Sequence, residues 1–519
     1  MCIVTHVCRF QADSLVQDAL EILGLARSLK NSFAPVNRIP SDVLSLLPDY
    51  CDEYDVDESL INSTHVCCSW REILISRSSL WTNLDFKNVN KTQTYIQRSR
   101  SSPLNITLRY IKGTTFDHAF SLVIPHISRL QSLAIYGIVP PKVLRHFRCP
   151  APLLEQLDID IRQSSRGLNG TRFDGALFNG ELPSLRELSL SGVITDLAWR
   201  NMENLTALTL SNCEAFENYK VSVTRILDFF ESHPFLQEVD LDNPTPDSSD
   251  APPGRIVPLR HLKTLTLTTC PPPSILLNHL HIPTRASLML CDNTGEELSP
   301  LDYLPDKSPN FENLSRITMI NLQFAPGYKS VRLGGPSGSL CLTSSLRAPR
   351  ARSSATVDHR LLCSIGPPRL PTIRRLAVSE YAHPPQAGIE ECPVFQTLSS
   401  LGTLRTLVLS DCDNLAFILA LDPEKNTSGL VLCPNLEEIV IYPSLYPRRE
   451  YARELVDMSK SRDSRGVKLS SIVIVDMQKS MKEVARLKEH VTHAEYRCED
   501  NSTWPTWDDV PDECRFEES

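Results

Sequence analysis

Histidine and cysteine side chains near the C-terminal end of the sequence are of the types that bind metal ions. His490 and His493 are close enough to share one face of a helix, and Cys498 and Cys514 follow at no familiar ligand spacing. A structural zinc ion takes four nitrogen or sulfur ligands held close together. We therefore interpret the four side chains as unrelated and predict no metal site.

Other arrangements that could perform chemistry are incomplete. His279 and His281 supply only two ligands, and the acidic segment 49–58 lacks the glycine and terminal glutamate of a calcium loop. The sequence has no phosphate-binding glycine loop, no Gly-x-Ser-x-Gly and no Cys-x-x-Cys. We predict no catalytic residue, no cofactor and no enzymatic activity; the alternative is an enzyme whose site follows no recognised pattern.

The net charge of the 519-residue chain is −9, and the acidic residues are unevenly placed. Residues 495–519 contain nine acidic and two basic side chains, so the rest of the chain is close to neutral. An acidic chain does not favour nucleic-acid binding. We interpret the acidic end as a solvated tail, with binding to a basic partner as the alternative.

Targeting and membrane signals are missing from the sequence. The first ten residues have no apolar stretch beside a basic region, and no run approaches the roughly 18 apolar residues of a membrane-spanning helix. We expect no membrane association and a cytoplasmic or nuclear location. The 16 cysteines are then expected to be reduced thiols.

Short leucine-rich units with the pattern aliphatic-x-x-aliphatic-x-aliphatic recur along most of the chain. Copies that begin with proline lie at 152–159, 183–190, 234–241, 371–378 and 434–441. Copies without the proline begin at Leu130, Leu205, Leu262, Leu314, Leu404 and Leu469. The alternating end of each unit predicts a short strand with alternate side chains buried. Recurrence at roughly regular intervals indicates stacked repeats.

Helices are expected between these strands. Within 221–232, four apolar residues fall on one helical face: Val223, Ile226, Leu227 and Phe230. Other helices are expected at 141–147, 274–280 and 394–401. Because one strand–helix unit cannot bury its apolar face alone, neighbouring units must stack. We predict an α/β solenoid with parallel strands along its concave side.

The repeated pattern resembles the leucine-rich repeat in an irregular form. That repeat places Asn or Cys three residues after the last strand leucine, and Cys213, Cys270 and Cys412 have this spacing here. We interpret these cysteines as small buried residues.

Two segments interrupt the repeats, and both are predicted to be loops. Residues 242–258 are rich in proline, serine and aspartate, and residues 325–371 include a glycine-rich stretch and the basic run 347–352. Such compositions are typical of loops or disordered segments. A phosphorylated or partner-binding segment is the alternative for the longer insertion.

The N-terminal part of the sequence is helical in pattern. A helix is predicted over 11–30 and interpreted as a packing helix, with a partner-binding helix as the alternative. Another is predicted from Ser41, a suitable cap, with Asp42 at its positive end.

A third helix is predicted over 58–76. In it, Val66, Trp70 and Ile73 fall at i, i+4 and i+7, so they would share one face.

Residues 38–86 resemble an F-box. The matching residues are Ile39-Pro40-x-x-Val43-Leu44, the stretch 64–72, and Ser78-Ser79-Leu80-Trp81. The resemblance extends to the F-box-like proteins of mushroom-forming fungi, in which a Tyr-Ile-x-Arg-Ser helix and a Ser-Pro-Leu strand follow. Both are present here, at 95–99 and 102–104.

The resemblance implies a substrate-recognition subunit of a cullin–RING (SCF-type) ubiquitin ligase. In such a subunit the F-box docks on the adaptor of the ligase and the repeats capture a protein substrate. The adaptor-binding residues that it implies are Ile39, Pro40, Val43, Leu44, Leu47, Val66, Cys67 and Trp70. It also implies that Trp70, Leu74, Leu80 and Trp81 hold the module together.

The substrate-binding residues are unknown from the sequence. Variable positions between the repeat leucines are where a substrate is expected: Arg186, Glu187, Arg374, Arg375, Glu437 and Glu438. Their alternative interpretation is that of solvated strand positions.

The resemblance leaves a second function open, a leucine-rich-repeat interaction scaffold with a degenerate F-box and no ligase link. Pro48 would end the first helix of the module early. In either case we divide the chain into four parts. These are a helical extension (1–35), an F-box-like module (36–86), an irregular repeat domain (87–480) and a helix with an acidic tail (481–519).

Overall fold

The computed structural model divides into two compact units, Met1–Arg162 with Ala176–Leu185 (the first unit) and Gln163–Gly175 with Arg186–Ser519 (the second unit). The structure describes residues 2–44, 46, 56–86, 88–109, 121–137, 149–161, 171–173, 177–195, 202–211, 221–242, 246–247, 252–268, 274–292, 301, 304, 316–325, 328–335, 338–345, 361–362, 365, 370, 372–379, 393–410, 414–426, 428–442, 451–475 and 481–497.

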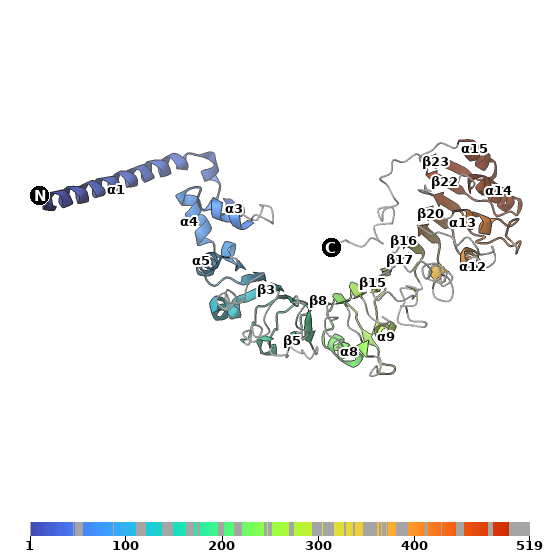
Figure 1. Ribbon diagram of the computed structural model, residues 1–519, viewed down its shortest axis with the longest axis horizontal. Helices are drawn as coiled ribbons and strands as arrows, with labels where there is room; N and C mark the ends of the chain where they lie inside the picture. Colours follow the sequence, from blue (N-terminus) through green and yellow to red (C-terminus); the bar gives the residue numbers. More distant parts are fainter. Residues whose placement is uncertain are drawn as a thin grey trace. The chain divides into compact units, whose positions relative to one another are not determined.

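The first unit begins with helices (Figure 1). They are α1 (Cys2–Ser32), the 3-10 turn η1 (Pro35–Arg38), α2 (Ser41–Leu44), α3 (Val56–Ser63), α4 (Cys68–Ser76), η3 (Ser78–Trp81) and α5 (Val89–Ser99). The helix predicted over 11–30 is therefore present and longer than expected. Every side chain from residue 12 to residue 33 is exposed, so its interpretation as a packing helix is wrong.

The helix predicted over 58–76 is broken into α3 and α4. The Ser63 and Thr64 hydroxyls donate to the carbonyls of Ser59 and Ile61, and Cys67 is extended at φ −160°. Hydroxyl side chains that bond to the preceding turn weaken helix propagation. Val66 therefore precedes α4 and does not share a helical face with Trp70.

The strands of the first unit pair in parallel in chain order. They are β1 (Asn83–Asp85), β2 (Leu104–Arg109), β3 (Leu130–Gly137) and β4 (Gln156–Ile161). The turns η4 (Ile124–Arg129) and η5 (Leu177–Gly180) complete its described elements. Alternate residues of β2 are buried, as a half-covered strand requires.

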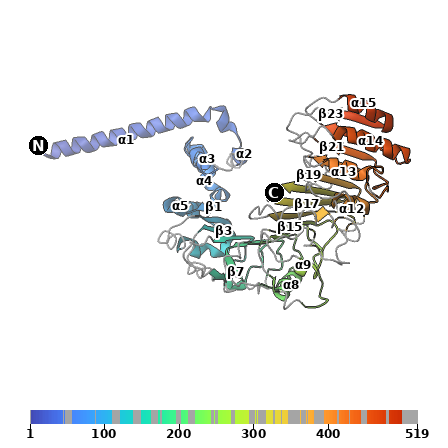
Figure 2. The same cartoon turned by 45° about the vertical axis from the view of Figure 1, so that its right-hand side comes forward.

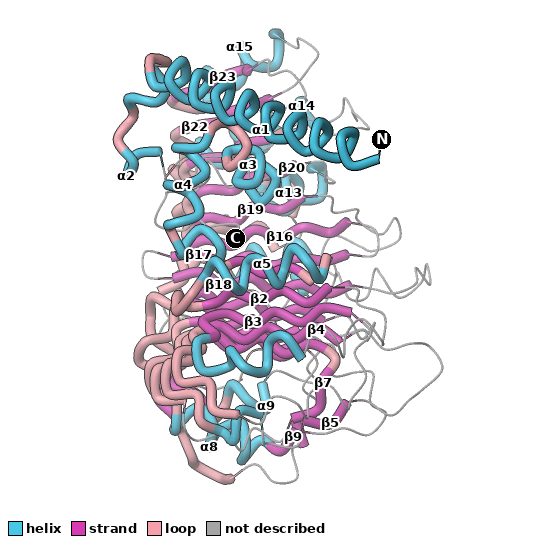
Figure 3. Tube along the Cα trace, turned by 90° about the vertical axis from the view of Figure 1, so that its left-hand side faces the viewer, coloured by secondary structure: helices cyan, strands magenta, loops and turns pink. Residues whose placement is uncertain are grey.

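The second unit contains two runs of parallel strands, and several strands of the second run are labelled in Figure 3. The first run is β6 (Glu187–Ser191), β8 (Ala207–Ser211), β10 (Glu238–Asp242), β13 (Thr264–Thr268) and β15 (Ser287–Asp292). The second is β16 (Met319–Ala325), β19 (Arg375–Ser379), β20 (Thr406–Ser410), β21 (Glu438–Ile441), β22 (Ser471–Val475) and β23 (His493–Arg497). The expected mixed α/β architecture with a large, mostly parallel sheet is confirmed.

Two further strands join these runs, where the sequence predicted a loop. β17 (Tyr328–Gly335) pairs antiparallel with β16 and with β18 (Gly338–Ser345), and β18 pairs in parallel with β15. The loop prediction for 325–371 is therefore wrong over 328–335 and 338–345, where Val331, Leu333, Leu340 and Leu342 are buried. Glycine is required at Gly335, because a Cβ there would lie 2.4 Å from the backbone oxygen of Arg316.

Shorter strands pair outside the main ladder of the second unit. They are β5 (Thr171–Phe173) with β7 (Val193–Thr195), β9 (Val221–Ser222) with β11 (Pro246–Asp247), and β12 (Val257–Pro258) with β14 (Leu280–His281). The segment 242–258, predicted to be a loop, thus contributes two short strands.

The described helices of the second unit alternate with strands from β19 to β23, and two more lie among the strands of the first run. These helices are α8 (Val223–Ser232), α9 (Ser274–Leu277), α12 (Pro393–Ser400), α13 (Asn414–Leu421), α14 (Tyr451–Ser464) and α15 (Met481–His490). In Figures 1 and 2, α12 to α15 line one side of strands β19 to β23. The predicted apolar face of α8 is confirmed, since its four residues are buried.

Backbone hydrogen bonds connect successive repeat units in the second unit. The amide of Gln237 donates to the Thr206 carbonyl at 2.7 Å, that of Lys263 to Gln237 at 2.7 Å, and that of Ser287 to Lys263 at 2.7 Å. The first aliphatic position of the described units is buried throughout: Leu154, Leu185, Leu205, Leu236, Leu262, Ile373, Leu404, Leu436 and Leu469. The strand-and-core pattern predicted from the repeated units is confirmed at these positions.

Several predictions fall on residues that lie outside the described ones. These are the helix at 141–147, the cysteines Cys213, Cys270 and Cys412, the acidic stretch 49–55, the basic run 347–352 and the tail beyond residue 497. Among the described helices, none combines the length and apolar character needed to cross a membrane.

Candidate interaction surface

Trp81 packs against α4 and α5 in the first unit. Its side chain is fully buried, and its Nε1 donates a 2.9 Å hydrogen bond to the backbone oxygen of Leu74. The Tyr95 ring meets it edge-on at 4.9 Å between centroids, and the Arg98 guanidinium lies 4.3 Å from its ring centroid. These contacts join α4, η3 and α5 into one packed cluster.

Arg129 connects this cluster with the first strands. Its Nη1 donates to Ser99 Oγ at 3.1 Å and to the Ser102 carbonyl at 3.0 Å. Burial lowers the pKa of Arg129. The end of α5 and the start of β2 are thereby held by one guanidinium.

Three large apolar side chains among the described residues between 40 and 86 remain open to solvent. Val43 on α2 is 48% exposed, Leu46 after α2 is 42% exposed, and Val66 before α4 is 53% exposed. We call Val43, Leu46 and Val66 the exposed apolar set. The F-box resemblance implies adaptor binding for Val43 and Val66 but not for Leu46. The spacing of three residues between Val43 and Leu46 indicates that they could lie on the same side of a helix.

The other implied adaptor-binding residues differ in burial. Pro40 is exposed, and Ile39 and Cys67 are half-buried. Leu44 and Trp70 are buried, with 2% and 8% of their surface exposed, so they belong to the core of this segment. Leu47 lies outside the described residues.

Helix α2 contacts the end of α4 through its backbone. The Leu44 amide donates to the Pro40 carbonyl at 2.9 Å, which closes the helical turn. Nη1 of Arg77 reaches the Asp42 carbonyl at 3.5 Å. Burial of Leu44 beneath this turn orients the neighbouring Val43 toward solvent.

The strand face of the first unit carries a polar row. The hydroxyl of Tyr136 donates to the Asp158 carboxylate on the adjacent strand, and the Arg109 guanidinium lies 4.9 Å from the Tyr136 ring centroid. Burial, together with the bond to Asp158, raises the pKa of Tyr136 to about 12. Tyr136 therefore stays protonated and acts as a donor at physiological pH.

The variable positions proposed for substrate contact lie where strands begin. Arg186, Arg374 and Glu437 are exposed, and their carbonyls accept amides from the following repeat unit. Arg405 Nη1 lies 3.1 Å from the Glu437 carboxylate, with both side chains about half exposed. Glu187 is exposed, and Arg375 and Glu438 are half-buried. The structure thus presents these side chains as a row along one end of the strands.

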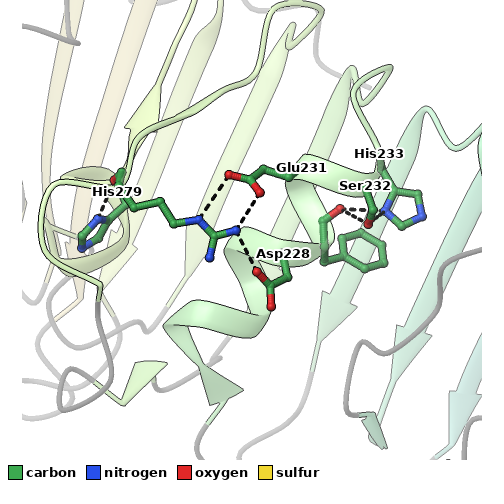
Figure 4. Close-up of polar contacts among 7 residues, drawn as sticks. Asp228, Glu231, Ser232, His233 and His279 are labelled. Carbon is green, nitrogen blue, oxygen red and sulfur yellow. Dashed lines mark hydrogen bonds and ion pairs between the residues drawn. The ribbon is translucent and has the colours of Figure 1, made fainter.

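A separate polar cluster links α8 with the segment that follows β10 (Figure 4). Nη2 of Arg255 lies 2.7 Å from Asp228 and 2.8 Å from Glu231, and Nε donates to Glu231 at 3.2 Å. The Arg255 carbonyl also lies 2.9 Å from His279 Nδ1. These contacts give His279 a structural partner.

The metal candidates of the sequence analysis are not brought together. His490 ends α15 and lies 3.5 Å from Asp463, whereas His493 lies on β23 and is 3.5 Å from Glu495. They therefore do not share a helical face. Cys498 and Cys514 lie outside the described residues. Within the described part of the chain, no group of three or more His, Cys, Asp or Glu side chains could hold a metal ion.

No protein-family model matches this chain, and no curated protein is similar to it at a significant level.

Proposed function

We propose that this protein is the substrate-recognition subunit of a cullin–RING (SCF-type) ubiquitin ligase. In this proposal residues 36–86 are an F-box-like module that docks on the adaptor, and the strand–helix units form an irregular leucine-rich-repeat solenoid that captures a protein substrate. The observation that carries the proposal is the exposed apolar set beside a core that is already closed by Trp70, Leu74 and Trp81.

The burial pattern supports docking at this segment. Val43 and Val66 are not needed to complete the core, because Leu44, Leu60 and Leu74 already fill it. Exposed apolar side chains on a small helical segment lose solvent-exposed surface when a partner covers them. An adaptor helix or sheet with an apolar surface is the kind of partner that they fit.

The repeat units support the capture of a second protein. Parallel strands presented in a row, with charged and polar residues at the same position in successive units, offer an extended surface for a polypeptide. The role requires no bond chemistry in this chain. It consists of holding a substrate lysine near the charged conjugating enzyme, which raises the effective concentration of the reacting groups.

The adaptor interface can be tested with purified full-length protein. We expect the wild type to bind a purified adaptor of the ligase in calorimetry, and Val43→Asp combined with Val66→Asp to weaken binding at least about 100-fold, because two apolar contacts are replaced by charges. Leu153→Asp is the matched control, since Leu153 is 47% exposed elsewhere in the first unit. Leu44 is unsuitable for this test because its burial couples binding to folding.

The outcomes separate the two functions. Adaptor binding that survives the double substitution would place docking elsewhere and contradict the proposal. Wild-type protein that binds no adaptor, but retains another partner in affinity capture with the proteasome inhibited, would favour the interaction scaffold.

A further inference from the structure

Helix α1 presents a long row of apolar side chains to solvent. Leu15, Ile22 and Leu29 are 69%, 68% and 63% exposed. Other large apolar residues of the same stretch are exposed by 45% to 72%: Val16, Leu20, Leu23, Leu25 and Phe33. A helix of this length owes most of its stability to the packing of an apolar face. These side chains therefore indicate a partner that covers them.

The spacing of these residues identifies the kind of partner. Apolar residues alternate at intervals of three and four: Ala12, Leu15, Ala19, Ile22, Ala26, Leu29 and Phe33. This is a heptad pattern held over three heptads, which keeps one face of a helix against another helix in a left-handed supercoil. The face extends over about 33 Å at 1.5 Å per residue.

We propose that α1 pairs with α1 of a second copy of this chain in an antiparallel coiled coil. One heptad position holds Ala12, Ala19 and Ala26 and ends with Phe33, and the other holds Leu15, Ile22 and Leu29. An antiparallel pair places each alanine opposite a large side chain of the other helix, which fills the interface evenly. A parallel pair would instead stack alanine on alanine and leave thin layers.

The charges of α1 favour the same arrangement. Within the stretch 12–33, the first half carries Asp13, Asp18 and Glu21, and the second half carries Arg27 and Lys30; Arg9 precedes this stretch. Antiparallel pairing brings the acidic half of each helix beside the basic half of the other, and it also opposes the two helix dipoles. Parallel pairing would gather six acidic groups at one end.

A membrane surface fits this helix less well than a second copy. Helices that bind anionic lipid carry an excess of lysine and arginine on their polar face. Residues 12–33 carry three acidic and two basic side chains.

The oligomeric state of the full-length protein tests this inference independently of adaptor binding. Sedimentation over a wide concentration range should give a mass of twice 58.3 kDa. Ile22→Asp should raise the dimer dissociation constant on the order of 100-fold or more, because both copies lose a buried side chain. Gln17→Asp adds the same charge on the polar face and should leave the dimer intact. A monomer at every concentration, or a dimer that Ile22→Asp does not affect, would overturn the proposal.

The direction of pairing has its own measurement. Carbodiimide coupling of mixed isotope-labelled and unlabelled protein should join Lys30 of one chain to Asp13 of the other, because Lys30 lies about two residues along the axis from Asp13 in this register. In a parallel pair Asp13 and Lys30 are separated by about 26 Å along the axis, which a zero-length bond cannot span. A dimer that forms no such interchain bond would overturn the antiparallel arrangement.

Discussion

The backbone oxygen of Cys433 accepts a 2.9 Å hydrogen bond from Nη2 of Arg462, a fully buried arginine on α14. Nη1 of the same side chain donates to the Leu432 carbonyl at 2.8 Å. Cys433 has a φ of 46°, a left-handed conformation that is strained for a residue with a Cβ. Burial raises the pKa of the Cys433 thiol to about 12, so it stays neutral. The guanidinium thus holds a strained turn at the entrance to β21.

Arg462→Met is expected to destabilise the second unit. The substitution keeps most of the apolar stem but removes the donor to the Leu432 carbonyl, at about 1 to 3 kcal/mol, whereas the Cys433 carbonyl still accepts from the Leu436 amide at 3.0 Å. We expect the free energy of unfolding in urea to fall by roughly 1 to 3 kcal/mol. Lys460→Met on the exposed side of the same helix is the control and should change it by less than about 0.5 kcal/mol. Equal midpoints for the two variants would contradict this role.

Trp81→Phe is expected to loosen the packing of α4, η3 and α5. Phenylalanine keeps an aromatic ring beside Tyr95 but cannot donate to the Leu74 carbonyl, which costs about 1 to 3 kcal/mol when that acceptor stays buried. Amide hydrogen exchange across α4 and α5 should become faster, whereas exchange in β19 to β22 should not change. Gln97→Ala, at an exposed position of α5, is the matched control. Unchanged exchange in α4 would exclude this function of the indole.

The elements that the sequence predicted correctly are those specified by local spacing. Apolar residues recur every three or four positions in α8 and every second position in the strands after the proline–leucine units. Each spacing places the apolar side chains on one face of only one kind of secondary structure. The split between α3 and α4 depends on two hydroxyl groups that compete for carbonyls, and apolar spacing does not report that competition. The sequence did not predict β17 and β18, because the glycines at their ends are typical of a loop. Glycine is present at Gly335 because the backbone there lies too close to Arg316 for a side chain.

Which apolar side chains of the segment 36–86 are exposed could not be predicted from the sequence. Val43 and Leu44 are adjacent apolar residues in the sequence, yet one is 48% exposed and the other 2%. Which of them faces a partner depends on how α2 lies against α4, a tertiary relationship. The same limit applies to α1, since an apolar stripe in a sequence does not reveal whether the chain itself covers it.

Arg255→Gln is expected to have a small and salt-dependent effect. Arg255 pairs with Asp228 and Glu231, whose side chains are 61% and 48% exposed, so water and ions screen the attraction. We expect a loss of about 1 kcal/mol or less in the free energy of unfolding near physiological salt, and a smaller loss in 1 M salt, where the Debye length is about 3 Å. A loss that does not change with salt would indicate packing of the arginine stem instead.

His233 is expected to make the second unit less stable in mild acid. It is 1% exposed, stacks on Phe229 at 4.1 Å between centroids, and its Nδ1 lies 2.7 Å from the Phe229 carbonyl (Figure 4). Within the described part of the chain its Nε2 has no hydrogen-bond partner, so protonation there would bury an unpaired donor. Burial accordingly lowers the pKa of His233 below its ordinary value of 6.5.

The sign of the effect follows from the direction of that shift. Between the lowered pKa of the folded state and about 6.5, the unfolded chain binds the extra proton, so stability rises with pH through this window and is complete above it. His233→Gln removes the titrating ring, and the urea midpoint of the variant should fall less than that of the wild type as the pH is lowered from 7.5 to about 5. His126, whose pKa burial also lowers, titrates equally in both proteins and cancels in the comparison. Parallel pH profiles for the two proteins would show that His233 is not a source of acid sensitivity.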